Sequence, residues 1–195
     1  MTAITPLESI HKKGTFGDHH KKNERDLLNI SEVKNLKIIQ IVKYKKTNIE
    51  LKNIKIDELE IPLHNLKVTS NKETRILWNA PRTWFVISSK ENIIEKIKEK
   101  FSSDDFALTD ISHSRATIKI KGLQAKEILK KGSPINFNEF KKNNCAGTVF
   151  HGINIVIDSI EDNPETYHIL TLRSFGESLY HHVSDAALEF GYVGV

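Results

Sequence analysis

The sequence predicts an α+β fold built from two halves, each of which runs strand, strand, helix. Residues 73–88 have the pattern of a hairpin that leads into a helix at 91–101, and residues 147–172 have the pattern of strands that lead into a helix at 175–190. A further strand and helix, at 110–131, lie between the two halves. Because the same order of elements occurs twice, we expect two packed α+β layers.

The N-terminal segment is polar, with a basic run at 19–22 and two glycines, Gly14 and Gly17. It holds too little apolar surface to offset the entropy cost of ordering an independent fold. We therefore expect a polar N-terminal arm at residues 1–29, ordered only where a neighbouring surface holds it, followed by a single domain at residues 30–195.

The segment from Lys34 to Lys55 holds seven lysines and one acid, Glu50, with apolar residues interleaved between them. The pattern from Leu36 to Leu51 favours strands. Two interpretations of the lysines stay open: a solvated or edge-protecting face, or a docking surface for an acidic partner subunit. A net charge of +4 is compatible with nucleic-acid binding. Because arginine–aromatic clusters and glycine-rich tracts are lacking, we do not expect a nucleic-acid partner.

The first predicted hairpin pairs residues 73–79 with 83–88 across the Ala80-Pro81 turn. Its two tryptophans, Trp78 and Trp84, are expected as core or interface anchors, with ligand stacking as the alternative. In the helix that follows, Ser88 or Ser89 is available as a cap, and the apolar face is formed by Ile93, Ile94, Ile97 and Phe101.

The middle unit has a strand at 116–121, where polar and apolar residues alternate. Gly122 breaks this strand, and a short helix follows. Its apolar face is formed by Ala125, Ile128 and Leu129. Gly132 is predicted to end the helix in a left-handed conformation, and Pro134 prevents its continuation.

The second half has predicted strands at 147–151, 153–160 and 167–172, with a turn at Asn163-Pro164. Gly191 is predicted to end the last helix. The apolar residues of that helix recur at i, i+4, i+7, i+8 and i+11, and they are Leu179, Val183, Ala186, Ala187 and Phe190.

The spacing of the nine histidines does not predict a metal site. No two of them lie three or four residues apart, and His181 and His182 point about 100° apart because they are adjacent on the predicted helix. His113, within Asp-Ile-Ser-His-Ser, suits a hydrogen-bonded turn better than a metal ligand.

The sequence also lacks the pattern of a catalytic nucleophile. Ser174 has no Gly-x-Ser-x-Gly context and is predicted to be the N-cap of the last helix, with Glu177 completing a capping box. Cys145 has no neighbouring base, so we expect a buried or incidental thiol. Arg173 could clamp a carboxylate, or it could pair with Asp110 or with a partner chain. Without a Gly-x-Gly-x-x-Gly loop, we expect no flavin or nicotinamide site in this chain.

Composition narrows the class of protein. The chain has 195 residues, 38% hydrophobic and 28% charged, which is ordinary for a globular protein in water. No apolar run approaches the roughly 20 residues of a membrane span, and the first residues lack the apolar pattern of a secretory signal, so we expect no signal peptide. The single cysteine, Cys145, forms no internal disulfide. We expect a cytoplasmic protein with no membrane partner.

Five segments, in their order and spacing, resemble one known fold family. They are Thr-Pro-Leu at 5–7, Ile-Pro-Leu at 61–63, Leu-Trp-Asn-Ala-Pro-Arg-Thr-Trp-Phe-Val-Ile at 77–87, the strand–helix unit at 110–136, and Arg-Ser-Phe-Gly-Glu-Ser-Leu at 173–179. This arrangement resembles the aminomethyltransferase-like domain shared by the glycine-cleavage T-protein and the subunits of heterotetrameric sarcosine oxidase. From about residue 5 to residue 191, the chain is similar to the small gamma subunit family of sarcosine oxidase.

The resemblance implies a non-catalytic gamma subunit with sarcosine oxidase alpha, beta and delta subunits as partners. The complex that it implies demethylates sarcosine oxidatively to glycine, using FAD, covalently attached FMN and NAD held by the larger subunits. That complex passes the one-carbon unit to tetrahydrofolate. Folate-handling relatives use an acidic residue downstream of the strand–helix unit. Because Glu139 is the only acid at 137–148 and its context does not match, the resemblance assigns no catalytic, cofactor or metal residue to this chain.

Two other functions stay open on the sequence. One is the equivalent subunit of an N-methylglutamate dehydrogenase, which belongs to the same superfamily. The other is a stand-alone protein that binds tetrahydrofolate or transfers aminomethyl groups. For contacts with a partner, we expect the arm at 1–29 and the exposed members of the tryptophan hairpin, since large aromatic residues anchor interfaces.

Overall fold

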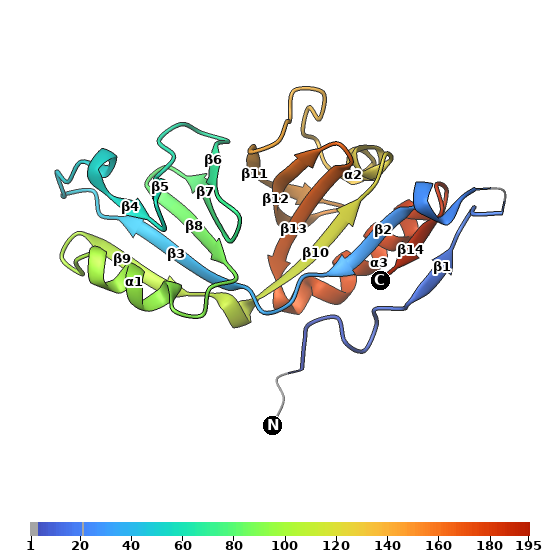
Figure 1. Cartoon of the computed structure of the whole chain (residues 1–195), viewed down its shortest axis with the longest axis horizontal. Coiled ribbons are helices and arrows are strands. Elements are labelled where there is room, and N and C mark those ends of the chain that lie inside the picture. Colours follow the sequence, from blue (N-terminus) through green and yellow to red (C-terminus); the bar gives the residue numbers. More distant parts are fainter. Residues whose placement is uncertain (1–3, 21) are drawn as a thin grey trace. The chain divides into compact units, whose positions relative to one another are not determined.

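The computed structural model of the chain describes residues 4–20 and 22–195. Its contacts divide the chain into two compact units (Figure 1). Unit 1 is drawn from the residues up to Lys34, from Ser114–Lys142 and from Gly147–Val195, and unit 2 from Asn35–His113 and Asn143–Ala146. Among the described residues, no helix has the length and apolar character needed to cross a membrane.

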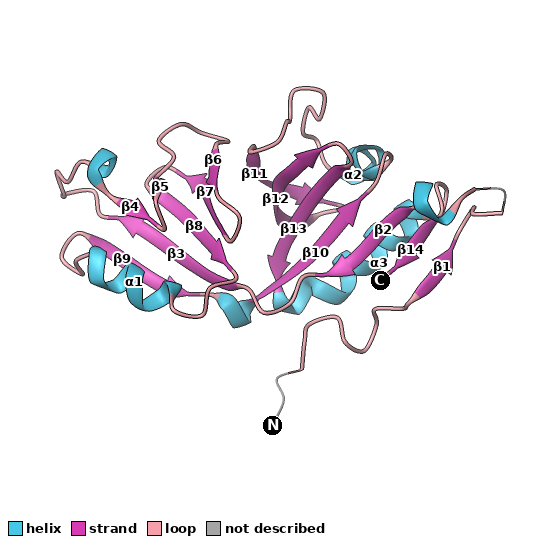
Figure 2. Ribbon diagram, viewed as in Figure 1, coloured by secondary structure: helices cyan, strands magenta, loops and turns pink. Residues whose placement is uncertain are grey.

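Unit 1 contains a seven-stranded sheet in the order β1-β14-β2-β10-β13-β12-β11 (Figure 2). The pairing of β14 with β2 is parallel, whereas β1 with β14, β2 with β10, β10 with β13 and β13 with β12 are antiparallel. The strands are β1 (Gly14–Phe16), β2 (Leu28–Glu32), β10 (Arg115–Lys121), β11 (Cys145–Phe150), β12 (Ile153–Asp162), β13 (Glu165–Leu172) and β14 (Tyr192–Gly194).

The described part of the predicted arm is built into this sheet and is not a separate region. β1 pairs with β14, and β2 lies between β14 and β10. Upstream of β1, Leu7 is fully buried. The Glu32 carboxylate accepts hydrogen bonds from Thr5 Oγ1 at 2.7 Å and from the Leu7 backbone N at 3.2 Å. The surface that orders the arm is therefore unit 1 itself. For residues 1–3 and Lys21, the prediction lies outside the described residues.

Two helices of unit 1, α2 (Ala125–Gly132) and α3 (Gly176–Ala187), contact each other and the sheet at β13, and α3 also contacts β10. The predicted apolar face of the last helix is confirmed, because Leu179, Val183, Ala186 and Ala187 are all buried. This helix is shorter than predicted and ends before Phe190, which is half-buried. Gly191 has φ +73°, the left-handed conformation predicted for it.

Two predicted helix termini are wrong. Gly132 has no positive φ and forms the last residue of α2. It is needed there for space, because a Cβ at this position would lie 2.6 Å from Cδ2 of His151 and 2.8 Å from the ring of Phe150. Ser174 is not an N-cap, since it lies within a 3-10 turn that leads directly into α3. Phe175 occupies the N-cap position of α3, where no side chain makes a capping hydrogen bond.

Unit 2 contains a five-stranded sheet in the order β6-β7-β8-β3-β9 and a separate two-stranded sheet, β4-β5. The predicted tryptophan hairpin is confirmed as β7 and β8, with Trp78 opposite Trp84 in register. The elements are β3 (Lys37–Lys43), β4 (Lys55–Ile56), β5 (Leu59–Glu60), β6 (Val68–Ser70), β7 (Thr74–Ala80), β8 (Thr83–Ser88), β9 (Phe106–Asp110) and the helix α1 (Ile93–Lys100).

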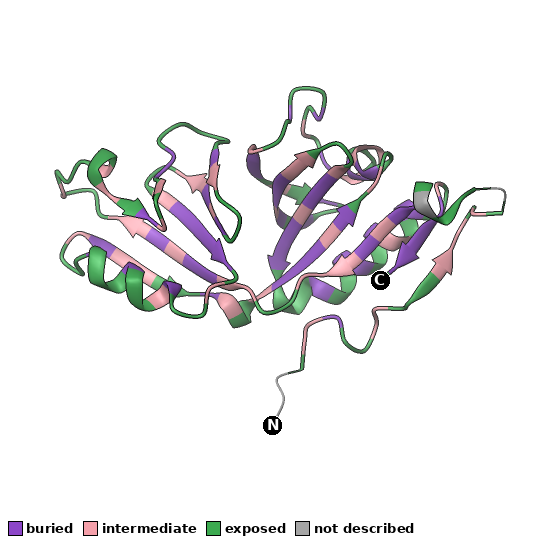
Figure 3. Ribbon diagram, viewed as in Figure 1, coloured by how far each residue is buried: buried purple, intermediate pink, exposed green. Residues whose placement is uncertain are grey.

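The core of unit 2 lies between α1, the sheet and the β4-β5 segment. Along several strands buried residues occur in runs and do not strictly alternate with exposed ones (Figure 3), and in β8 all five residues at 84–88 are buried. The buried residues of this core are Ile39, Ile41, Ile56, Ile61, Ile76, Trp84, Val86, Ile93, Ile97, Phe101 and Phe106. Ile93, Ile97 and Phe101 are three of the four residues predicted for the apolar face of this helix.

Two predictions in unit 2 need correction. The strand pattern from Leu36 to Leu51 holds only as far as Lys43, after which the chain turns away from the sheet. Because β3 pairs with both β8 and β9, its lysines do not protect a sheet edge. Neither predicted serine caps α1: the N-cap is Asn92, without a side-chain bond, and Ser88 Oγ accepts the backbone N–H of Lys90 at 3.1 Å.

Candidate functional site

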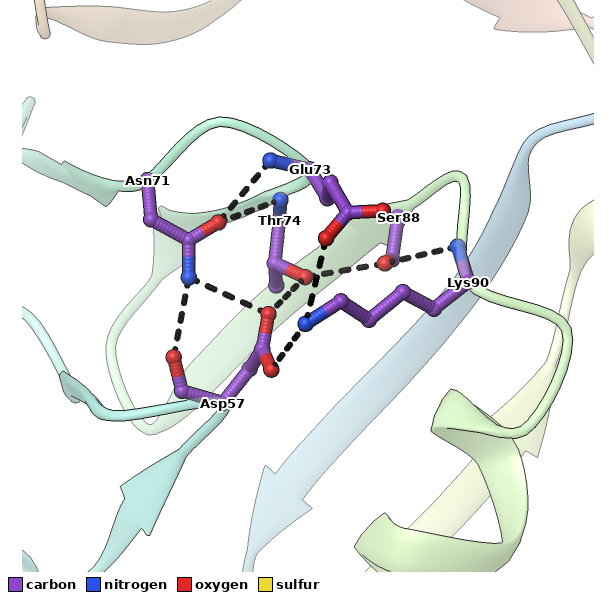
Figure 4. Close-up of polar contacts among 6 residues, drawn as sticks. All are labelled: Asp57, Asn71, Glu73, Thr74, Ser88 and Lys90. Atoms are coloured by element: carbon purple, nitrogen blue, oxygen red, sulfur yellow. Dashed lines mark hydrogen bonds and ion pairs between the residues drawn. The ribbon is translucent and has the colours of Figure 1, made fainter.

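A cluster of polar side chains in unit 2 joins the β4–β5 turn to the neighbouring ends of β7 and β8 (Figure 4). The side chains come from three segments that are far apart in the sequence. In the close-up, three of them bond to the carboxylate of the turn residue, and the other two contact those three. The members of this cluster are Asp57, Asn71, Glu73, Thr74, Ser88 and Lys90.

The carboxylate of Asp57 accepts three hydrogen bonds: from Lys90 Nζ at 2.5 Å, from Thr74 Oγ1 at 2.7 Å and from Asn71 Nδ2 at 3.1 Å. The hydroxyls of Thr74 and Ser88 lie 2.9 Å apart and share a further hydrogen bond. The bond from Lys90 is the largest cause that lowers the pKa of Asp57 from 3.8 to about 2, against the opposing effect of burial. The same bond raises the pKa of Lys90.

This cluster acts as a structural lock on the β4–β5 turn. Asp57 and Glu58 have φ of +51° and +64°, a left-handed turn that needs support from outside the turn for residues other than glycine. The donors to Asp57 come from β7 and from the residues around β8, so they fasten the turn to the sheet. The Asn71 amide completes the lock, because its Oδ1 accepts the backbone N–H groups of Glu73 and Thr74 at 2.9 and 2.8 Å.

Unit 1 has a polar row that sequence reasoning missed. The strand register places Ser31, Lys119, His168 and Asp158 directly opposite one another, from β2 across β10 and β13 to β12. Asp158 is fully buried, whereas Lys119 and His168 are half-buried. The period-two pattern gives the face of each residue but not the register, so the row could not be found in the sequence.

The histidines considered as metal ligands have separate contacts. His181 Nε2 lies 3.8 Å from Glu177 Oε1, with both side chains exposed. The ring of His182 stacks on that of His151 at a centroid distance of 5.0 Å. His181 and His182 line a hollow of about 420 Å³ beside α3. Within residues 4–20 and 22–195, no three His, Cys, Asp or Glu side chains are grouped so that they could hold a metal ion.

The two tryptophans are core anchors, as predicted. Trp84 is only 3% exposed, and its Nε1–H donates to the carbonyl of Pro62 at 2.8 Å. Trp78 packs half-buried against the core of unit 2. Cys145 is buried, as expected, and its thiol donates to the Trp78 carbonyl at 3.2 Å. The ring of Trp84 therefore offers no open face for a flat ligand.

The other residues considered for chemistry have local structural contacts. Arg173 Nη2 donates to the backbone carbonyl of Ile4 at 2.5 Å, which ties the described start of the chain to the 3-10 turn before α3. Asp110 accepts from the hydroxyl and the backbone N–H of Ser112 at 2.5 and 2.9 Å, and these bonds lower the pKa of Asp110. His113 is exposed in the adjoining 3-10 turn, which agrees with the predicted turn. Glu139 is exposed in the loop between α2 and β11.

Comparison with solved structures shows the fold. The chain is similar to a chain of the heterotetrameric sarcosine oxidase from Corynebacterium sp. U-96, solved in complex with pyrrole 2-carboxylate, with 17% identity, a TM-score of 0.81 and coverage of 97% of each chain. It is also similar to the glycine cleavage system aminomethyltransferase T from Bartonella henselae, with 12% identity and a TM-score of 0.58. That match covers 82% of this chain but only 46% of the aminomethyltransferase. The predicted aminomethyltransferase-like α+β fold is therefore confirmed.

Comparison of the sequence alone identifies the family. No curated protein sequence matches the chain closely enough to count as a relative. The sequence profile of one family, described as the sarcosine oxidase gamma subunit family, matches residues 53–189, which is well over half of the chain. The match includes both tryptophan strands, the middle strand–helix unit and α3. The chain therefore belongs to the sarcosine oxidase gamma subunit family.

Proposed function

We propose that this chain is the non-catalytic gamma subunit of a heterotetrameric sarcosine oxidase. It packs against larger subunits and supports their oxidative demethylation of sarcosine to glycine, while the flavin, nicotinamide and folate groups are held by those subunits. The observation that carries the proposal is the family match over residues 53–189, together with a fold similarity that spans 97% of the chain.

The contacts of the candidate residues support a role without chemistry of its own. Asp57 already accepts three hydrogen bonds from other side chains. Trp84 and Cys145 are buried and donate to backbone carbonyls. Groups that are held in this way serve the fold, because a substrate would have to displace an existing partner in order to bind them.

Coexpression tests the proposal. The larger subunits are produced with and without this chain, and the assembled species, its flavin content and its turnover of sarcosine and of N-methylglutamate are measured. We expect that omission of the chain lowers the yield of the assembled complex and its sarcosine turnover. Full assembly, flavin content and activity without the chain would refute the role. Turnover of N-methylglutamate in place of sarcosine would reassign the complex, and binding of tetrahydrofolate by the isolated chain in calorimetry would contradict the non-catalytic assignment.

A further inference from the structure

Unit 2 has an open hollow of about 350 Å³ at the end of β3, which we call the basic hollow. It is lined by Lys43, residues 48–52 and Leu63. Its charged lining residues are Lys43, Lys52 and one acid, Glu50. Lys45 and Lys46 lie in the loop between the lining residues Lys43 and Asn48, and we call these four lysines the rim of the hollow. Leu51 packs against the core of unit 2, whereas Ile49 and Leu63 are 36% and 45% exposed. An apolar centre with a charged rim is the arrangement of a protein interface, in which the rim excludes water from a buried anchor.

The positive charge of the chain concentrates around this hollow. Residues 43–55 include five lysines and one acid, Glu50, so this short segment has the same net charge, +4, as the whole protein. The side chains of Lys45, Lys46 and Lys52 are exposed, and none of the three lies within ion-pair distance of a carboxylate among the described residues.

Several lysines elsewhere in the chain pair with carboxylates, unlike Lys45, Lys46 and Lys52. Within unit 2, Lys37 pairs with Glu91 at 2.8 Å and Lys90 with Asp57 at 2.5 Å. Unit 1 repeats this in four pairs at 2.6 to 2.8 Å: Lys126–Glu165, Lys130–Glu127, Lys131–Glu189 and Lys142–Glu161. Lys43 lies on β3, which is an interior strand, so this lysine does not guard a sheet edge.

The rim of the hollow is held in place by the fold. Lys43 Nζ donates to the carbonyl of Ile49 at 2.5 Å, which closes the loop after β3. The backbone N–H of Tyr44 donates to the Asp105 carbonyl at 2.9 Å, and the Thr47 hydroxyl donates to the Asp105 carboxylate. A preformed site of this kind loses less conformational entropy when a partner binds.

From these observations we infer that the basic hollow is the docking site for an acidic segment of a larger subunit. This segment places one apolar side chain between Ile49 and Leu63, flanked by Asp or Glu residues that meet the lysine rim. The inference rests on the proposed function, since it requires that the chain assembles with larger subunits. Its attraction is electrostatic at the rim and hydrophobic at the centre.

The test uses the coexpressed complex, captured through a tag on this chain and washed with increasing NaCl. One variant, the rim variant, reverses the three exposed lysines of the rim: Lys52→Glu, which lies in the lining itself, with Lys45→Glu and Lys46→Glu from the adjoining loop. A second, the floor variant, is Leu63→Asp, which charges an apolar residue of the lining. The matched control reverses three exposed lysines of unit 1, Lys12, Lys13 and Lys121, to glutamate, so that the net charge changes equally. Urea unfolding followed by tryptophan fluorescence checks that every variant folds.

At about 0.15 M NaCl, we expect the rim and floor variants to retain at least about ten-fold less of the larger subunits than the wild type, and the control to stay within about two-fold. Wild-type retention combined with normal retention by both hollow variants would overturn the inference and leave the proposed function intact. Failure of the wild type to retain the larger subunits would overturn both. The wild type and the rim variant are also passed over immobilised DNA. Retention of the wild type but not of the rim variant on DNA, with retention of the larger subunits unchanged, would identify a nucleic-acid site and overturn the inference.

Discussion

Replacement of Asp57 by asparagine tests the lock in unit 2. Asparagine has nearly the same shape and tolerates the left-handed φ of +51° at this position. The substitution therefore keeps the turn, removes the charge and replaces one acceptor oxygen by an NH2 group, so that one carboxylate oxygen's donors lose their acceptor. Tryptophan fluorescence reports directly on the affected unit, because Trp78 and Trp84 are the two tryptophans of the chain and both lie in unit 2.

The magnitude follows from the pKa of Asp57, which folding lowers from 3.8 to about 2. Each pKa unit corresponds to about 1.4 kcal/mol, so the upper limit of the stabilisation is about 2.5 kcal/mol. The Lys90 side chain is 26% exposed and the Asp57 side chain 10% exposed, so solvent screening lowers this value. We expect that Asp57→Asn lowers the free energy of unfolding of unit 2 by about 1–2 kcal/mol at neutral pH.

The pH dependence has a definite sign. Because the folded state has the lower pKa, the contribution of Asp57 is complete above the unfolded value near 4, and it is lost as the pH falls through the folded value of about 2. At about pH 3, roughly half of the difference between wild type and variant should remain. The measurement is urea unfolding at a series of pH values.

Glu73→Gln is the control for this experiment. Its carboxylate lies 3.4 Å from the same Lys90 Nζ but is 52% exposed, so the expected cost is below about 0.5 kcal/mol. Equal losses for the two variants, or a loss for Asp57→Asn that does not shrink as the pH falls, would show that the Asp57–Lys90 contact is not what stabilises the turn.

Three further substitutions test other contacts. Gly132→Ala should lower the free energy of unfolding by about 1–3 kcal/mol, because the new Cβ would lie 2.6 Å from the ring of His151. Urea unfolding followed by far-UV circular dichroism measures this loss, and an unchanged midpoint would contradict the close packing. Leu179→Ala removes a fully buried side chain of α3 and should cost about 2–5 kcal/mol by the same assay, with a loss below about 1 kcal/mol arguing against this core. Trp84→Phe keeps an aromatic ring but leaves the Pro62 carbonyl without its donor, which should lower the free energy of unfolding by about 1–3 kcal/mol. Urea unfolding monitored through Trp78 measures this loss, and full stability would show that the bond is dispensable.

The elements that could be predicted from the sequence are those specified by local periodicity. The tryptophan hairpin, the strand at 116–121 and the face of α3 all follow from apolar residues at fixed spacing. β1 and β14 could not be predicted, because each has three residues and their pairing joins residues 14–16 to 192–194. Short strands of this kind exist only through long-range contacts.

The surface features were predictable to different degrees. The lysines at 43–55 are evident in the sequence, and a docking surface is one of the two interpretations that the sequence supports. Whether those lysines pair with acids depends on the folded chain, so the basic hollow became visible only in the structure. The lock at Asp57 was missed because its partner Lys90 is 33 residues away, and no periodicity relates the two. At Gly132, the sequence indicated a constraint but not its cause, which is the close approach of Phe150 and His151.

The position of β14 in the sheet has a consequence for synthesis on the ribosome. β1 forms the end of the seven-stranded sheet, and its neighbour there is β14 (Figure 1). Residues 14–16 are translated before the rest of this sheet, yet their backbone groups can pair as they do in the finished protein only once residues 192–194 have emerged. Residues 35–113, which make up most of unit 2, have left the exit tunnel long before that moment. The sheet of unit 1 is thus completed only after residues 192–194 have been translated and have left the tunnel.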